Sequence, residues 1–136
     1  MSTLKKVVLI DDDTVNNFVC ESIIRNEKFS DDIISFEWAE DALNYLKEQA
    51  EKGASHFPDL IFLDINMPGM DGWSFIEEYR KLPEQCTTSC CLFMLSSAVD
   101  RKDILTAKSI EEVREFFSKP LSPEILEIIR EEYISN

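Results

Sequence analysis

Short apolar runs recur along the chain, and each of them ends at a polar residue. The runs are rich in Val, Ile, Leu and Phe, which is typical of strands that are buried on both faces of a sheet. They predict five strands, at residues 7–10, 33–36, 59–64, 90–95 and 113–117. The last of these is the weakest, because Arg114 and Glu115 interrupt its apolar character, although Ser118-Lys119-Pro120 ends it firmly.

Stretches with helical periodicity alternate with these strands. They predict helices at about 14–27, from 39 to near Gly53, from near Asp71 to Leu82, around 104–107, and from Ser122 to about 133. In the first helix, the apolar positions Val15, Val19 and Ile23 have helical spacing. Asp13 or Thr14 is the expected N-cap of this helix.

This alternation predicts the fold class. Five strand–helix units in one short chain imply an α/β fold of the flavodoxin-like type, (βα)5, a doubly wound five-stranded parallel sheet with helices on both faces. In such folds ligands bind beyond the carboxyl ends of the strands. The polar residues that follow the strands are therefore the first candidates for a functional site.

The composition narrows the class of protein. A length of 136 residues fits a single domain, expected to cover residues 1–136, and the apolar share of 44% beside 30% charged residues is that of an ordinary globular protein. No apolar run approaches the roughly 20 residues that span a bilayer, and the N-terminus lacks a secretory signal, which favours a cytoplasmic location. The net charge of −13 argues against direct binding to nucleic acid or an anionic membrane, because both require local positive potential. Proteins, cations and small ligands are the expected partners.

The cysteines do not have the spacing of a metal site. Cys20, Cys86, Cys90 and Cys91 form no CxxC pair, and His56 is the single histidine. A zinc site is therefore not expected. We expect free thiols in a reducing compartment.

Five polar residues follow the predicted strands, namely Asp11, Asp12, Asp64, Ser96 and Lys119. A parallel sheet places all of them along one edge. Three carboxylates in one place raise one another's pKa unless a cation compensates, and Mg²⁺ takes oxygen ligands and often serves phosphate chemistry. The hydroxyl of Ser96 and the amine of Lys119 can donate hydrogen bonds to phosphoryl oxygens.

These residues fit phosphoryl transfer to a carboxylate, which needs a nucleophile, a metal ion and donors for the phosphoryl oxygens. Asp64 is the better nucleophile because it stands alone after its strand, whereas Asp11 and Asp12 are adjacent and better suited to hold a metal ion. The simpler alternative is that these acids only cap helices or face water. We favour the site, because the acids, the hydroxyl and the lysine all fall where the topology predicts one.

The segments around these positions are Asp11-Asp12, Leu63-Asp64-Ile65-Asn66-Met67-Pro68-Gly69-Met70-Asp71-Gly72, Met94-Leu95-Ser96 and Phe116 to Lys119-Pro120. Together they resemble the response-regulator receiver domain (CheY-like) of two-component signalling, over about residues 5–134. The resemblance implies that Asp64 accepts a phosphoryl group from a phosphohistidine of a histidine kinase or a histidine phosphotransfer protein. It also implies Mg²⁺, or Mn²⁺ in its place, held by Asp12, Asp64 and the backbone carbonyl of Asn66, with Asp11 acting mainly through water.

The same resemblance implies roles for residues at the last two strands. Ser96 and Lys119 would contact the phosphoryl oxygens, and Ser96 and Phe116 would form the switch, with Phe116 changing its rotamer on activation. The Lys119–Pro120 peptide bond would be cis. Core packing is the alternative role for Phe116.

Two places depart from the commonest pattern of the family. Residues 110–113 lack the glycine that is frequent before the last strand, so this turn and the helix before it are expected to differ in shape. The position two residues after Ser96 is Ala98. In the family this position and Asn66 influence the lifetime of the phosphoryl group, which the sequence leaves open.

The leading hypothesis is a stand-alone receiver, a monomer or weak dimer, whose phosphorylation changes its binding to a downstream protein. It would catalyse only its own phosphorylation and dephosphorylation, and it is not expected to be an enzyme that acts on an external metabolite. A small Mg-dependent aspartyl-phosphate phosphatase or phosphotransferase is one alternative, but such enzymes usually have a second Asp where this chain has Asn66. A receiver-like module that binds partners without phosphorylation is another, and the intact site residues argue against it.

Overall fold

The computed structural model describes residues 4–97 and 100–134 of the chain. At its centre lies a sheet of five parallel strands in the order β2-β1-β3-β4-β5. The strands are β1 (Val7–Ile10), β2 (Ile33–Phe36), β3 (Leu60–Leu63), β4 (Cys91–Ser96) and β5 (Val113–Ser118). The helices are α1 (Thr14–Asn26), α2 (Ala39–Lys52), α3 (Gly72–Tyr79), α4 (Glu84–Thr87), α5 (Arg101–Ser109) and α6 (Pro123–Ile129), with a 3₁₀ turn at Ala54–His56 and a π-helical turn at Arg130–Ile134.

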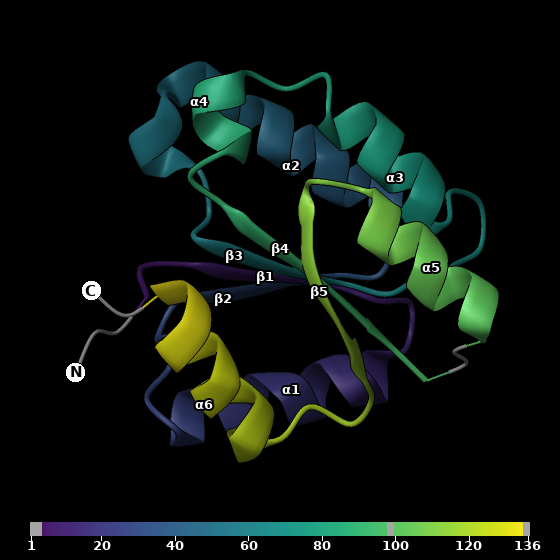
Figure 1. The fold of residues 1–136 in the computed structure, drawn as a ribbon. Helices are drawn as coiled ribbons and strands as arrows, with labels where there is room; N and C mark the ends of the chain where they lie inside the picture. The colour runs from purple at the N-terminus through teal and green to yellow at the C-terminus, as the bar shows by residue number, and fades with distance from the viewer. Residues whose placement is uncertain (1–3, 98–99, 135–136) are drawn as a thin grey trace.

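Helices cover both faces of the sheet (Figure 1). The helices α2, α3, α4 and α5 lie on one face, and α1 and α6 lie on the other. Successive side chains of a strand point to opposite faces, so Val8 and Ile10 of β1 pack under the first group of helices while Val7 and Leu9 pack under the second. Each face of the sheet has its own apolar core. The predicted α/β class, with a parallel five-stranded sheet and two helical layers, is confirmed.

The strand order places two of the acidic segments side by side. The chain moves from β1 to β2 on one side of the sheet, and it returns to β3 on the other side of β1. In the β1–β3 pair, Ile10 lies opposite Leu63. The residues that follow, Asp11 and Asp64, therefore leave the sheet next to each other, at the point where open α/β sheets bind ligands.

The mixed sequence of β5 follows from its place at the edge of the sheet. Its exposed positions include Arg114 and Glu115, and its register with β4 shifts between Leu92 and Phe93. An edge strand is covered on fewer sides than a central one, so polar residues are tolerated there. The fifth strand, which the sequence predicted most weakly, is confirmed.

The helix predicted at about 14–27 is confirmed as α1, and its apolar positions are divided between the core and the solvent. The buried residues of this helix are Asn17, Cys20 and Ile24, whereas Val15 and Val19 are exposed. The side chain of Asn17 donates a hydrogen bond to the carbonyl oxygen of Asp11 at 2.8 Å. The buried side of the helix combines this polar contact with the apolar packing of Cys20 and Ile24, and Val15 and Val19 are turned towards solvent.

The predicted third helix is shorter than expected. Helix α3 ends at Tyr79, and the amides of Lys81 and Leu82 donate to the carbonyls of Glu78 and Tyr79 in a turn. A separate short helix, α4, then begins after Pro83, which the sequence did not predict. Because Pro83 has no N–H, it cannot continue the preceding helix, but its fixed φ suits the start of the next one.

The turn before β5 closes without glycine. The amide of Val113 donates to the carbonyl of Ile110 at 3.1 Å, and Ile110 has an extended backbone with φ −101° and ψ 115°. These angles are accessible to any L-residue. The glycine that is frequent at this place in the family is therefore not needed here.

Candidate functional site

The first part of the site is the acid loop, which we define as residues 11–13. Its backbone continues from β1, and the amide of Asp11 donates to the carbonyl of Phe36 at 3.0 Å. Asp13 is the N-cap of α1, and its side chain accepts hydrogen bonds from the amides of Val15 and Asn16. The predicted cap at Asp13 is thus confirmed. The loop is held by the sheet on one side and by the helix on the other.

The two acids of this loop that the sequence assigned to the site, Asp11 and Asp12, differ in their surroundings. Asp11 is buried, whereas Asp12 is exposed. The Oδ1 of Asp11 accepts a hydrogen bond from the amide of Asp13 at 2.9 Å, and its Oδ2 accepts one from the side-chain amide of Asn16 at 2.9 Å. Of these two acids, Asp12 is the one that a ligand from solvent can reach directly.

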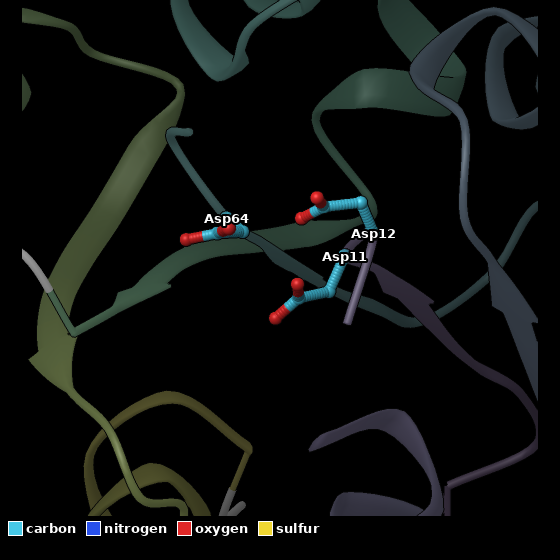
Figure 2. A group of neighbouring side chains, drawn as sticks. All are labelled: Asp11, Asp12 and Asp64. Atoms are coloured by element: carbon cyan, nitrogen blue, oxygen red, sulfur yellow. The ribbon is translucent and has the colours of Figure 1, made fainter. Parts of the chain in front are cut away.

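The third acid, Asp64, follows β3 and is buried. Its amide donates to the carbonyl of Ile10 at 3.0 Å, which joins the ends of β1 and β3. The carboxylates of Asp11, Asp12 and Asp64 lie near one another, and each offers one oxygen that lies within 4.8 Å of the others (Figure 2). The sequence prediction that these three acids meet is confirmed.

A close approach of α3 fixes the backbone around Asp64. The amide of Gly72 donates to the carbonyl of Ile65 at 2.8 Å. A Cβ atom at Gly72 would lie 2.7 Å from the backbone oxygen of Asp64 and 2.9 Å from the Cα of Ile65. These distances are too short for a side chain, so a glycine is needed where the loop after β3 enters α3.

Lys119 reaches into the acidic cluster from the end of β5. Its Nζ lies 2.5 Å from the Oδ2 of Asp11 and 3.8 Å from the Oδ1 of Asp64. Its backbone amide donates to the carbonyl of Ser96 at 3.1 Å, and the Lys119–Pro120 bond is cis, as the family resemblance implied. One cation therefore contacts two of the three carboxylates.

Ser96 lies at the end of β4, and its hydroxyl is buried without a hydrogen-bond partner among residues 4–97 and 100–134. A buried hydroxyl without a partner costs free energy, so it is rare unless a ligand or water completes it. The hydroxyl lies near the Asp64 carboxylate and lowers the pKa of that carboxyl as a potential hydrogen-bond donor, but the two groups do not have the geometry of a formed hydrogen bond. Ser96 therefore has donor capacity that remains unused beside Asp64.

The charges of the site act on one another. Burial raises the pKa of Asp64 above its ordinary value, and the charge of Asp11 adds to this effect, while Ser96 and Lys119 lower it without cancelling the rise. For Lys119, burial alone would lower the pKa, but its hydrogen bond and charge interaction with Asp11, and then the charge of Asp64, raise it. Lys119 is therefore charged at neutral pH, and a second cation near Asp64 would favour the ionised carboxylate.

Phe116 lies away from the acids, on β5. It is half-buried and packs against the core under α2, α3 and α5, and it also lines a cavity of about 160 Å³ between α5 and β5. The packing role considered for Phe116 is thus observed. Asn66 is exposed in the loop two residues after Asp64, and Ala98 lies outside the described residues.

Sequence reasoning missed two residues of the site, Asn16 and Asn17. Both donate side-chain hydrogen bonds to Asp11, one to its carboxylate and one to its backbone carbonyl. Their place in the first turn of a helix that follows an acid pair is the signal that could have found them, since such side chains lie within reach of the preceding loop.

The cysteines are free, as expected. Burial is the main cause that raises the pKa of Cys20 to about 11 and that of Cys90 to about 12. A thiol with so high a pKa remains protonated at neutral pH and is a poor nucleophile. Cys20 lines a small cavity beside Asp11 and Asp64, but it is not a candidate for the chemistry of the site.

Comparison with known proteins identifies the family. Residues 7–130 match the family model of the response regulator receiver domain. The chain belongs to this family. It is a receiver domain of two-component signalling, in a family that acts as signalling switches, and it has the flavodoxin-like fold of CheY-like receiver structures.

Solved structures of receivers are similar over nearly the full length of this one. A two component response regulator from Cytophaga hutchinsonii is 31% identical with a TM-score of 0.88, and the match covers 96% of this chain and 97% of that chain. A response regulator receiver protein from Dyadobacter fermentans is 30% identical with a TM-score of 0.85, over 96% of this chain and 99% of that chain.

A curated relative is longer than this receiver. The "Probable transcriptional regulator ycf27" of Porphyridium aerugineum is 28% identical over 123 residues, which are 90% of this chain and 45% of the relative. This receiver therefore spans less than half of the length of that relative.

Membership of the family bears on the ligands of the site. Receiver domains typically bind Mg²⁺ at an acidic pocket, and Asp11, Asp12 and Asp64 form such a cluster of oxygen donors in this receiver. Membership also implies interaction with kinase or phosphotransfer partners. None of the helices within residues 4–97 and 100–134 combines the length and apolar character that crossing a bilayer requires.

Proposed function

We propose that this receiver is a phosphorylatable switch, in which Asp64 accepts a phosphoryl group from a phosphohistidine of a histidine kinase or a histidine phosphotransfer protein. A carboxylate oxygen of Asp64 attacks the phosphorus, and the phosphorus–nitrogen bond of the donor breaks. The electron pair of that bond remains on the imidazole nitrogen, and an acyl phosphate forms on Asp64.

The observation that supports this most strongly is the unused donor capacity beside Asp64. The Ser96 hydroxyl is buried and has no partner within the described part of the chain, and the Nζ of Lys119 is 3.8 Å from the Asp64 carboxylate. Oxygens of a phosphoryl group on Asp64 would give both donors a charged acceptor. Ser96 would gain the partner that it lacks in the structure.

The acidic cluster fits a divalent cation, because Asp11, Asp12 and Asp64 offer oxygen donors within 4.8 Å of one another. We assign Asp12, Asp64 and the backbone carbonyl of Asn66 as ligands of Mg²⁺, or of Mn²⁺ in its place. Asp11 already accepts three donors, from Asp13, Asn16 and Lys119, so it would act on a bound metal ion through water. A cation held by these residues would supply positive charge to the phosphoryl oxygens during transfer.

The exposed face of α1 is the docking surface for the phosphodonor in this proposal. Val15, Phe18 and Val19 are 69%, 72% and 42% exposed, which is unusual for apolar side chains that gather on one helix. The helix starts at the acid loop, so a partner that covers this face can bring its phosphohistidine to Asp64. A complementary apolar helix surface of the donor is the expected occupant.

Phe116 and Ser96 form the switch. A phosphoryl group on Asp64 draws the Ser96 hydroxyl towards it, and Phe116, two strands away from Asp64, can move into the cavity of about 160 Å³ that it lines. Because Phe116 has no hydroxyl, its change acts through packing alone. The surface formed by α5 and β5 would then differ between the two states, and a downstream protein would bind one of them more tightly.

Labelling with a small phosphodonor tests the acceptor. Acetyl phosphate with Mg²⁺ should add one phosphoryl group to the wild type, seen by intact-mass spectrometry, and none at this site in Asp64→Asn. Equal labelling of the two proteins would overturn the assignment. Multiple turnover of a phosphorylated metabolite by the wild type would instead indicate an enzyme.

Transfer from a protein donor tests the docking surface separately. The donor is first found by phosphotransfer profiling against candidate histidine kinases. Phe18→Ala should slow transfer from that kinase but leave labelling by acetyl phosphate unchanged, because the small donor needs no docking surface. Leu105→Ala on α5, where an apolar side chain is 58% exposed, is the matched control and should leave both rates unchanged. Equal transfer to Phe18→Ala and to the wild type would rule out α1 as the docking surface.

A further inference from the structure

Two donors share one oxygen of Asp11. The Oδ2 atom accepts a hydrogen bond from the side-chain amide of Asn16 at 2.9 Å, and the Nζ of Lys119 lies 2.5 Å from the same atom. The other oxygen, Oδ1, is occupied by the amide of Asp13. Asp11 is buried, so these three donors replace the water that an exposed carboxylate would bind.

Lys119 is nearer to Asp11 than to Asp64. Its Nζ is 2.5 Å from Asp11 and 3.8 Å from Asp64. In the phosphorylated state proposed above, Lys119 would shift from Asp11 towards the phosphoryl oxygens on Asp64. Lysine is suited to such a movement, because its ammonium group is a point charge on a flexible chain.

We infer that Asn16 is a positioning residue, which holds the Oδ2 of Asp11 while Lys119 moves from Asp11 to the phosphoryl oxygens on Asp64. This inference rests on the proposed function of Asp64 as phosphoacceptor. Asn16 contacts neither Asp64 nor the phosphoryl group in this scheme. It acts through Asp11 and Lys119.

Asn16 is expected to matter because a buried carboxylate oxygen that loses its donor costs free energy. When Lys119 leaves, Oδ2 of Asp11 would lose a charged donor inside the protein, and a buried acceptor without a partner is costly. The amide of Asn16 remains bonded to this oxygen, so the carboxylate keeps a donor and its orientation. The movement of Lys119 is therefore less costly than it would be without Asn16.

The place of Asn16 in the fold supports a fixed orientation of its side chain. Its backbone amide donates to the Oδ1 of the N-cap Asp13 at 3.1 Å, in the first turn of α1. The side chain is half-buried, and the neighbouring Asn17 anchors the same turn to the backbone of Asp11. Asn16 thus needs no rearrangement to hold Asp11 in both states.

The first test removes the donor and keeps the size of the side chain. Asn16→Leu should lower the rate of labelling by acetyl phosphate at saturating Mg²⁺ about tenfold, the loss expected for one hydrogen bond to a charged group. Asn16→Ala should behave in the same way, which separates loss of the donor from any effect of the leucine. Asn26→Leu, an exposed position at the other end of α1, is the matched control and should keep the wild-type rate.

A double-mutant cycle separates positioning from a merely structural role. The readout is the apparent Kd for beryllium fluoride with Mg²⁺, a mimic of the phosphoryl group, followed by NMR in four proteins: the wild type, Asn16→Leu, Lys119→Met and the double variant. Asn16→Leu should weaken binding in the wild-type background. In the Lys119→Met background it should change the Kd by no more than about twofold, because there is no lysine left to release.

The outcomes distinguish this inference from the proposal on which it rests. Absence of labelling at Asp64 in the wild type would overturn the proposed function itself. A labelled wild type together with an unchanged rate in Asn16→Leu and Asn16→Ala would overturn only the role of Asn16. An equal loss of beryllium fluoride affinity in both backgrounds would show that Asn16 acts on the fold and not through Lys119.

Discussion

The acid loop and the β4–β5 end of the pocket, which we define by Ser96 and Phe116, differ in how their side chains are partnered. In the acid loop, both carboxylate oxygens of Asp11 accept donors, and its backbone carbonyl accepts the amide of Asn17. At the β4–β5 end, the hydroxyl of Ser96 has no partner, and Phe116 lines a cavity.

This difference indicates which part of the site stays fixed on phosphorylation and which part moves. A region whose polar groups are all partnered resists movement, because any shift breaks a hydrogen bond. In a region with an unpartnered hydroxyl and a cavity, a movement can form a new hydrogen bond, and a side chain has space to move. We therefore expect the acid loop to stay fixed when Asp64 is phosphorylated and the β4–β5 end to respond.

The largest expected effect comes from Lys119, which joins the two regions. Lys119→Met leaves Asp11 and Asp64 buried without their cation, so we expect the free energy of unfolding at neutral pH to fall by about 3 kcal/mol. Mg²⁺ should restore part of this loss, because it supplies positive charge at the same place. Urea unfolding with and without Mg²⁺ measures both quantities.

Lys108→Met on α5 is the matched control, because Lys108 is exposed and has no ion pair among those found within the described part of the chain. Its free energy of unfolding should stay near that of the wild type. If Lys119→Met were as stable as Lys108→Met without Mg²⁺, the two buried acids would not depend on the lysine.

A second substitution tests how rigid the fixed part of the pocket is. In Gly72→Ala the new Cβ would lie 2.7 Å from the backbone oxygen of Asp64 and 2.9 Å from the Cα of Ile65, and backbone atoms cannot move aside as easily as a side chain can. We expect a loss of about 2 to 3 kcal/mol in the free energy of unfolding, measured by urea denaturation. Ser74→Ala, exposed on the same helix, should have little effect. Wild-type stability in Gly72→Ala would mean that the backbone around Asp64 yields easily.

The central strands and the acids at their ends could be predicted from the sequence, because their signals are local. The runs 7–10 and 59–64 are apolar throughout and end at acids, and the parallel pairing of such strands brings Asp11 and Asp64 together. The position of Lys119 followed from the same topology. The edge strand β5 was harder to predict, because only part of its surface is buried.

The orientation of α1 could not be read from apolar spacing. Val15, Val19 and Ile23 form a regular apolar series, yet a single hydrogen bond from Asn17 to the carbonyl of Asp11 helps to determine which face meets the sheet. A polar contact of this kind depends on the path of the loop in space, which hydrophobic periodicity does not encode. For the same reason, the missing partner of Ser96 became visible only in the structure.

A pair of smaller substitutions compares the two regions directly. Asn17→Ala removes the donor from the buried carbonyl of Asp11, so we expect a loss of about 1 to 2 kcal/mol in the free energy of unfolding. Ser96→Ala removes a hydroxyl that has no partner, so its stability should stay within about 0.5 kcal/mol of the wild type.

Although Ser96→Ala should have little effect on stability, it should have a clear effect on the rate of phosphorylation. Ser96→Ala should label with acetyl phosphate about tenfold more slowly than the wild type, because a donor to the phosphoryl oxygens is lost. If Ser96→Ala lost as much stability as Asn17→Ala, the hydroxyl would have a partner in solution. The contrast between the two regions would then be wrong.

The smallest expected effect is a pH dependence that comes from Asp64. Burial and the charge of Asp11 raise its pKa in the folded state above the ordinary value, so ionised Asp64 lowers the stability of the fold at pH 7. Without divalent cations, Asp64→Asn should therefore have a higher Tm than the wild type at pH 7.

As the pH falls through the raised pKa, the folded wild type takes up a proton before the unfolded chain does, and the wild type gains stability relative to Asp64→Asn. The difference in Tm should thus shrink between pH 7 and the ordinary Asp pKa of about 4, and Mg²⁺ at pH 7 should also reduce it. A difference in Tm that is constant over this pH range would show that the Asp64 carboxyl has the same pKa in the folded and the unfolded protein.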